Sequence, residues 1–190
     1  MIKAIIFDCF GVLVAGTLEQ FIDKHFARDQ KLVQEAHDIN MQASRGLMSY
    51  EQQIQQFAIM AGISVEQTHR EMDANPRNDL LLSYIAQELK GAYKIGFLSN
   101  ASEDVRDELF TLEDLRLFDD FVLSYAVHLA KPDQAIYELA AQRLGVTVDA
   151  CLFVDDIETY VIGAQKAGMK ALQYRSLQEF KDDLERVLST

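Results

Sequence analysis

The sequence predicts a doubly wound α/β fold, in which a parallel sheet is covered by helices and a helical cap is inserted after the first strand. Short runs that are apolar at every position alternate with longer amphipathic stretches. Such runs are typical of parallel strands buried on both faces, and their alternation with helices is typical of open α/β sheets. The first two runs are separated by residues 8–94, which contain no convincing strand.

Five apolar runs are expected to be strands, and helices are expected between the later ones. Residues 134–144 carry apolar side chains on one helical face, as a helix packed on a sheet requires. Pro132, and Asn75 with Pro76, are expected to open helices, because proline fits the first helical turn. The expected strands are residues 4–7, 95–98, 121–123, 151–154 and 171–172.

Residues 16–74 are expected to form the helical cap, and residues 1–15 and 75–190 the α/β core. Three Ser/Thr-x-x-Gln patterns, beginning at Thr17, Ser49 and Ser64, are typical of capping boxes at helix starts. An apolar stripe at helical spacing follows Ser49.

Composition restricts the classes of partner. The chain has 190 residues, 49% of them hydrophobic and 25% charged, which is ordinary for a globular protein. Its formal charge of −12 argues against binding to nucleic acid or to an anionic membrane surface. No apolar run has the length of a transmembrane span or the form of a signal peptide, so we expect a cytoplasmic protein. Cys9 and Cys151 lie in strand-like runs and are expected to be buried, reduced thiols.

Polar side chains follow the expected strands at the edge where open α/β sheets bind ligands. The three carboxylates among them repel one another unless a cation intervenes, and an all-oxygen ligand set favours Mg²⁺. One carboxylate can then attack phosphorus, while a lysine and the metal neutralise charge on the phosphoryl oxygens. A serine and free loop amides, such as those of Cys9 and Phe10, can hold the remaining oxygens. These polar residues are Asp8, Ser99, Asn100, Lys131, Asp155 and Asp156.

Four segments in this order resemble the motifs of the haloacid dehalogenase superfamily, whose core is Rossmann-like: FDCFGVL (7–13), LSN (98–100), KPD (131–133) and FVDD (153–156). The resemblance implies that Asp8 is the nucleophile and a Mg²⁺ ligand, and that Lys131 stabilises it. Ser99 and Asn100 would bind phosphate, with the backbone of Cys9 and Phe10. Asp156 and the Phe10 carbonyl would ligate Mg²⁺ directly, and Asp155 would do so through water.

Two positions depart from the phosphatase pattern. Phosphatases of this superfamily usually carry a second aspartate where this chain has Phe10, and its side chain protonates the leaving oxygen. Without that acid, hydrolysis should be slow except for leaving groups that depart unprotonated. Tyr160 stands where relatives often have Asn or Asp. The roles of Tyr160, of Arg45 in the cap and of His128 before Lys131 stay open, and His128 is a candidate replacement acid.

The resulting expectation is a Mg²⁺-dependent hydrolase of small phosphorylated metabolites, which acts through an aspartyl-phosphate on Asp8. A haloacid dehalogenase is the first alternative, because dehalogenases have a tyrosine at the position of Phe10 and a halide leaves without a proton. A non-enzymatic binding protein on the same fold is the second alternative.

Overall fold

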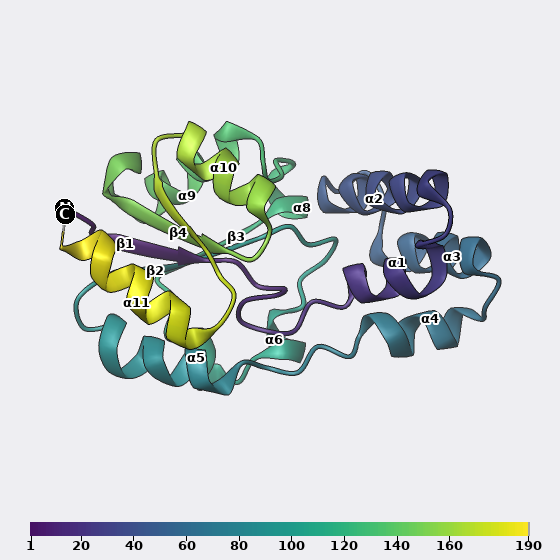
Figure 1. The fold of residues 1–190 in the computed structure, drawn as a ribbon, viewed down its shortest axis with the longest axis horizontal. Coiled ribbons are helices and arrows are strands. Elements are labelled where there is room, and N and C mark those ends of the chain that lie inside the picture. The colour runs from purple at the N-terminus through teal and green to yellow at the C-terminus, as the bar shows by residue number, and fades with distance from the viewer. Residues whose placement is uncertain (190) are drawn as a thin grey trace.

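The protein was analysed as a computed structural model that describes residues 1–189. Its centre is a five-stranded, wholly parallel sheet in the order β3-β2-β1-β4-β5 (Figure 1). All five expected strands are present, extended by at most one residue at either end, so the predicted fold class is confirmed. The strands are β1 (Ala4–Phe7), β2 (Lys94–Ser99), β3 (Asp120–Leu123), β4 (Cys151–Asp155) and β5 (Lys170–Gln173).

Helices cover both faces of the sheet. One face carries α5 (Asp79–Tyr84), the π-helical turn η1 (Ile85–Leu89) and α11 (Leu177–Leu188), and the other carries α9 (Gln134–Arg143) and α10 (Glu158–Lys166) (Figure 1). Successive side chains of β1 point to opposite faces, as a strand requires. Ile5 and Phe7 therefore pack with the first layer, whereas Ala4 and Ile6 pack with the second. Short elements complete the core: α6 (Arg106–Leu109), α7 (Leu112–Leu115), α8 (Ser124–Val127) and η2 (Val148–Ala150).

The insertion after β1 is entirely helical and lies beyond the end of the sheet toward which β1 points (Figure 1). Its helices pack around an apolar cluster of their own, which includes Phe21, Phe26, Ile39 and Phe57. The placement of the domain boundaries after residues 15 and 74 stays a prediction. The cap helices are α1 (Leu18–Phe26), α2 (Gln30–Ser44), α3 (Tyr50–Ala61) and α4 (Val65–Met72).

In the inserted helical cap, a residue that the sequence predicts to cap the N-terminus of a helix does so only where its side chain bonds to residues next to it in the chain. Ser49 forms the complete capping box with Gln52, and the Ser64 side chain accepts the Gln67 amide. The capping role expected for Thr17 is wrong, because its hydroxyl donates to the carbonyl oxygen of Met72 at 2.6 Å. That bond links the beginning of the cap to its end.

The helix expected at Asn75 and Pro76 begins three residues later than predicted. Asn78 is the residue that caps α5, since its side chain accepts the Leu81 amide. The same side chain donates to the carbonyl of Val12 and the hydroxyl of Tyr174. These tertiary contacts fix where α5 starts.

Among residues 1–189, no helix combines the length and apolarity that a bilayer span requires.

Candidate active site

Asp8 stands at the carboxyl end of β1, on a tight loop. The Cys9 carbonyl accepts the amides of Leu13 and Val14, which folds the chain back on itself. Gly11 in this loop has φ +89°, a conformation that favours glycine. A Cβ at Gly11 would also lie 2.2 Å from the Asp156 carboxylate, so glycine lets the loop approach that side chain.

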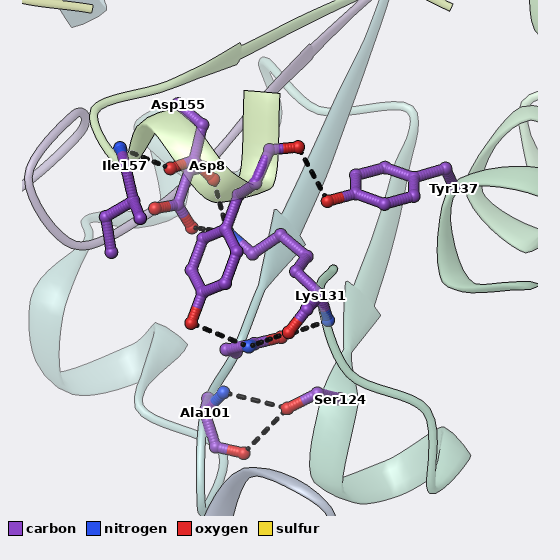
Figure 2. A network of polar contacts seen from close by, with 9 residues as sticks. Asp8, Ala101, Ser124, Lys131, Tyr137, Asp155 and Ile157 are labelled. Carbon is purple, nitrogen blue, oxygen red and sulfur yellow. Dashed lines mark hydrogen bonds and ion pairs between the residues drawn. The ribbon is translucent and has the colours of Figure 1, made fainter. Parts of the chain in front are cut away.

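Lys131 lies between two carboxylates at the centre of the site (Figure 2). Its Nζ is 2.7 Å from Asp8 Oδ1 and 2.6 Å from Asp155 Oδ2, and all three residues are buried. The other Asp155 oxygen accepts the Ile157 amide at 2.9 Å. Asp155 is therefore held by two protein donors, whereas Asp156 Oδ1 is buried and has no hydrogen-bond partner among the described residues.

Burial of so much charge shifts the pKa values of Asp8, Asp156 and Lys131. Burial raises the pKa of Asp8, and neighbouring Asp155 raises it further, against the lowering effect of Lys131. Burial and then Asp155 raise the pKa of Asp156 to about 6. Burial acts to lower the pKa of Lys131, but its pairs with Asp155 and Asp8 outweigh this effect and raise it. The ammonium is thus held charged.

The carboxylates fit a divalent cation. Oxygens of Asp8, Asp155 and Asp156 lie within 4.8 Å of one another. Three ionised carboxylates and one ammonium leave a formal charge of −2, which a divalent cation would balance. Hard oxygen donors without sulfur or imidazole suit Mg²⁺. The unpartnered Asp156 oxygen is the donor most clearly free to bind it.

Groups that could donate hydrogen bonds to a bound phosphate surround Asp8. Ser99, at the end of β2, is 1% exposed, and its hydroxyl has no partner among residues 1–189. The amides of Cys9 and Phe10 donate no hydrogen bond to another described residue. A buried hydroxyl and free amides next to a carboxylate can bind the oxygens of an anion. These phosphate-binding roles, like the metal-binding ones, stay predictions.

Asn100 also lies in the site, but its amide is already bonded to Lys131. Its Oδ1 accepts the Lys131 amide at 2.9 Å, and its Nδ2 donates to the Lys131 carbonyl at 3.0 Å. Nδ2 also lies 3.4 Å from the hydroxyl of Tyr160. A direct phosphate contact by Asn100 would compete with these bonds.

A cavity of about 580 Å³ opens between Asp8 and the cap, and we call it the cap–core cavity. Phe10 lines it beside Asp8, with no carboxylate at that position. The cap side of its wall includes Tyr50, Glu51, His69 and Asp73, and the core side includes Glu103 and Glu108.

His69 is one of the cavity residues that no sequence pattern predicts to lie there. Its Nδ1 is 3.1 Å from Asp73 Oδ2, and its Nε2 is 3.1 Å from Glu51 Oε2. Burial acts to lower the pKa of His69, but the bonds to Asp73 and Glu51 outweigh it and raise the pKa. Capping patterns locate helix ends in the cap, and they do not tell which helix face turns toward the sheet.

His128 does not line the cap–core cavity. Its Nδ1 lies 3.1 Å from the carbonyl oxygen of Arg45, so it joins the core to the cap. The Arg45 guanidinium donates to Asp133 at 2.8 Å. Arg45 and His128 thus meet at a junction between α2 and the core, outside the cavity.

The comparison with protein families decides the classification. The model of the haloacid dehalogenase-like hydrolases matches residues 2–168. The chain belongs to this hydrolase family. It is 36% identical over 99 residues to Phosphatase MT3486 of Mycobacterium tuberculosis, an alignment that covers 51% of this chain and 46% of that protein. The matched segment therefore spans about half the length of this curated relative.

This chain shares its fold with solved structures of a phosphate-bound enzyme and of a dehalogenase. A HAD-family enzyme of Bacteroides thetaiotaomicron, in complex with magnesium and inorganic phosphate, matches with a TM-score of 0.70 at 23% identity, over 93% of this chain and 96% of that one. A 2-haloacid dehalogenase of Pseudomonas syringae matches with a TM-score of 0.59 at 19% identity, over 92% and 86%. At these identities the likeness concerns the fold, and the choice of chemistry depends on the side chains.

Proposed function

We propose that this hydrolase cleaves small phosphate monoesters with the help of Mg²⁺, through an aspartyl-phosphate on Asp8. The observation that carries the proposal is the cluster of Asp8, Lys131, Asp155 and Asp156 at one end of the sheet. The named phosphatase relative supports the same class of reaction. Asp8, Asp156 and the Phe10 carbonyl would hold the metal directly, and Asp155 would do so through water. When bound, Mg²⁺ would neutralise charge on the carboxylates and the phosphoryl oxygens.

The side chains of this chain divide the chemistry among them. An ionised Asp8 oxygen attacks phosphorus, and the bond from phosphorus to the ester oxygen breaks. Lys131 balances the charge of Asp8 and of the phosphoryl group, while the Ser99 hydroxyl and the amides of Cys9 and Phe10 donate to phosphoryl oxygens. Water then attacks the phosphorus of the aspartyl-phosphate, which releases inorganic phosphate and restores Asp8.

Phe10 restricts the leaving group. No proton is available from this position, so the ester oxygen departs as an anion or takes its proton from another donor. Hydrolysis should therefore be slow for alkyl esters and faster for aryl esters. The carboxylates of Glu51, Asp73 and Glu103 along the cavity should disfavour an organic group that is itself negatively charged.

The test compares p-nitrophenyl phosphate with glycerol 2-phosphate, each with Mg²⁺ or with EDTA. We expect Mg²⁺-dependent turnover of the aryl ester and much slower turnover of the alkyl ester. Asp8→Asn should lower the aryl rate by at least about a thousandfold, because the nucleophile is lost. Absence of turnover of both esters, or a rate that Asp8→Asn does not change, would overturn the proposal.

The same observation about Phe10 keeps a dehalogenase as the second candidate, because a halide needs no proton. In that reaction Asp8 attacks the halogen-bearing carbon, the carbon–halogen bond breaks and the halide departs, and water then hydrolyses the resulting ester to restore Asp8. Halide release from 2-chloropropionate in EDTA, abolished by Asp8→Asn, would favour this candidate over the phosphatase.

A further inference from the structure

The Lys131 ammonium reaches two carboxylates at once. Its Nζ lies 2.7 Å from Asp8 and 2.6 Å from Asp155. A lysine side chain has four rotatable bonds and no rigid plane, so its position depends on what holds its backbone and what packs along its length. A misplacement of about 1 Å in a catalytic group can cost about a hundredfold in rate.

Asn100 holds the backbone of Lys131 from both sides. It accepts the Lys131 amide and donates to the Lys131 carbonyl, at 2.9 and 3.0 Å. These residues are 31 positions apart, so the pair of bonds ties the segment after β2 to the segment before α9. The side chain of Ser124 fixes the neighbouring residue, Ala101, in the same reciprocal way, at 3.0 and 3.1 Å (Figure 2).

Tyr160 packs against the other end of Lys131. The Lys131 Nζ lies over its ring, 4.8 Å from the ring centroid. An aromatic face attracts an ammonium at this distance and limits where it can move. Tyr160 is itself fixed, because its carbonyl accepts the hydroxyl of Tyr137 at 2.8 Å. Its hydroxyl is the second partner of the Asn100 amide, at 3.4 Å.

Close packing of α10 makes this arrangement possible. A Cβ on Gly163 would lie 2.8 Å from the Pro132 side chain and 2.9 Å from the Tyr137 hydroxyl. Glycine at this position therefore lets the helix that carries Tyr160 approach the segment that carries Lys131.

We propose that Asn100 and Tyr160 are positioning residues, which act through Lys131 and hold its ammonium between Asp8 and Asp155. Asn100 fixes the Lys131 backbone, and the Tyr160 ring confines the ammonium. This role replaces the phosphate contact expected of Asn100 and gives a function to Tyr160. The kinetic part of the test rests on the proposed phosphatase activity, whereas the spectroscopic part does not.

The first measurement observes Lys131 directly, by NMR of protein labelled with ¹³C and ¹⁵N in lysine, with Lys131→Met for assignment. The ring current of Tyr160 should shift the εCH₂ and ammonium signals of Lys131 upfield. Tyr160→Leu should reduce the upfield shift to the part that comes from Phe153, whose ring centroid lies 5.5 Å from the Lys131 Nζ. Tyr160→Phe should keep the whole shift, and Asn100→Ala should move or broaden the same signals. Signals that stay unchanged in Asn100→Ala and Tyr160→Leu would overturn the proposal, whatever the activity.

The second measurement is a double-mutant cycle on aryl phosphate hydrolysis. Asn100→Ala and Tyr160→Leu should each lower kcat by about 10- to 100-fold with little change in KM, and Tyr160→Phe should restore most of the loss. In a Lys131→Met background, Asn100→Ala should change the residual kcat by less than about twofold, because its effect passes through Lys131.

The outcomes separate the possible roles. If Asn100→Ala raises KM and weakens inhibition by inorganic phosphate to the same extent with or without Lys131, Asn100 is a phosphate ligand and the proposal is wrong. If all variants lose activity together with thermal stability while the Lys131 signals stay unchanged, the effect is structural and the proposal is wrong. If the expected NMR changes occur in a protein that hydrolyses no phosphate ester, the positioning role stands and the proposed function fails.

Discussion

Replacing Phe10 with aspartate should place a general acid beside Asp8. Phe10 lines the cap–core cavity beside Asp8, so a carboxyl group there would face the same space as the nucleophile. Turnover of glycerol 2-phosphate should rise by about 10²- to 10⁴-fold, the usual contribution of a general acid. Turnover of p-nitrophenyl phosphate should change little, because p-nitrophenolate departs without a proton.

The structure indicates that the substitution is tolerable and that the new carboxyl would carry its proton. Among non-glycine residues in 1–189 only His128 has a positive φ, so the backbone at Phe10 accepts aspartate without strain. Nearby Asp8 and Asp156 would disfavour ionisation of a further carboxyl group and keep it protonated near neutral pH. Phe10 is partly buried against the apolar cluster around β1, so its loss should cost about 1–3 kcal/mol of stability.

The assay is kcat/KM for the two esters with saturating Mg²⁺, with Phe10→Asn as the matched control. Asparagine has nearly the same size as aspartate but cannot act as the acid. Phe10→Asp should therefore gain activity on the alkyl ester alone. Equal gains on both esters, or an equal gain in Phe10→Asn, would refute a role in proton donation.

Two further changes test the site and the cap. Gly11→Ala places a Cβ 2.2 Å from the Asp156 carboxylate, so it should displace that side chain and weaken Mg²⁺ binding, measured by calorimetry, by about tenfold or more. Gly91→Ala, where the new Cβ lies in open space, is the control and should not weaken it. Equal affinities of the two variants would contradict the proposed ligand role of Asp156. Glu71→Gln should destabilise the protein by roughly 1 kcal/mol at pH 7, since the hydrogen bond from Lys24, with those from His25 and Gln67, lowers the pKa of the partly exposed Glu71 to about 2. A lowered pKa stabilises the fold above the ordinary value of 4.5, so the difference between the proteins in denaturant unfolding should shrink as the pH falls from 4.5 toward 2, and a constant difference would refute this linkage.

The sheet could be predicted from sequence because its strands are buried on both faces. A strand such as residues 151–154 must be apolar at every position, and this leaves a signal that needs no knowledge of distant residues. Helix starts were predictable where capping is local, as at Ser49. They were not predictable where the side chain at the helix start makes hydrogen bonds to distant parts of the chain. Thr17 bonds to Met72, and Asn78 bonds to Val12 and Tyr174.

The difference between local sequence signals and tertiary contacts also separates the predicted half of the site from the rest. Asp8, Lys131, Asp155 and Asp156 meet as expected because each follows a strand or its adjoining loop, and parallel strands end at one edge. The contact between Asn100 and Lys131 and the place of His69 in the cavity depend on side-chain packing and on how the cap folds over the sheet. No local pattern in the chain encodes either of them.

Charge provides the sharpest distinction between the two chemistries that this fold supports. The three carboxylates and Lys131 sum to −2, and a haloacid substrate would add a further negative charge to an already anionic, buried site. A divalent cation would remove that excess and give a phosphate dianion a positive partner, so Asp156, the proposed metal ligand, would be costly for a dehalogenase and useful for a phosphatase. Asp156→Asn should therefore separate the two: it should lower Mg²⁺-dependent phosphatase turnover by about 10-fold or more, whereas it should leave or improve halide release in EDTA. An unchanged phosphatase rate in Asp156→Asn would show that this charge argument is wrong.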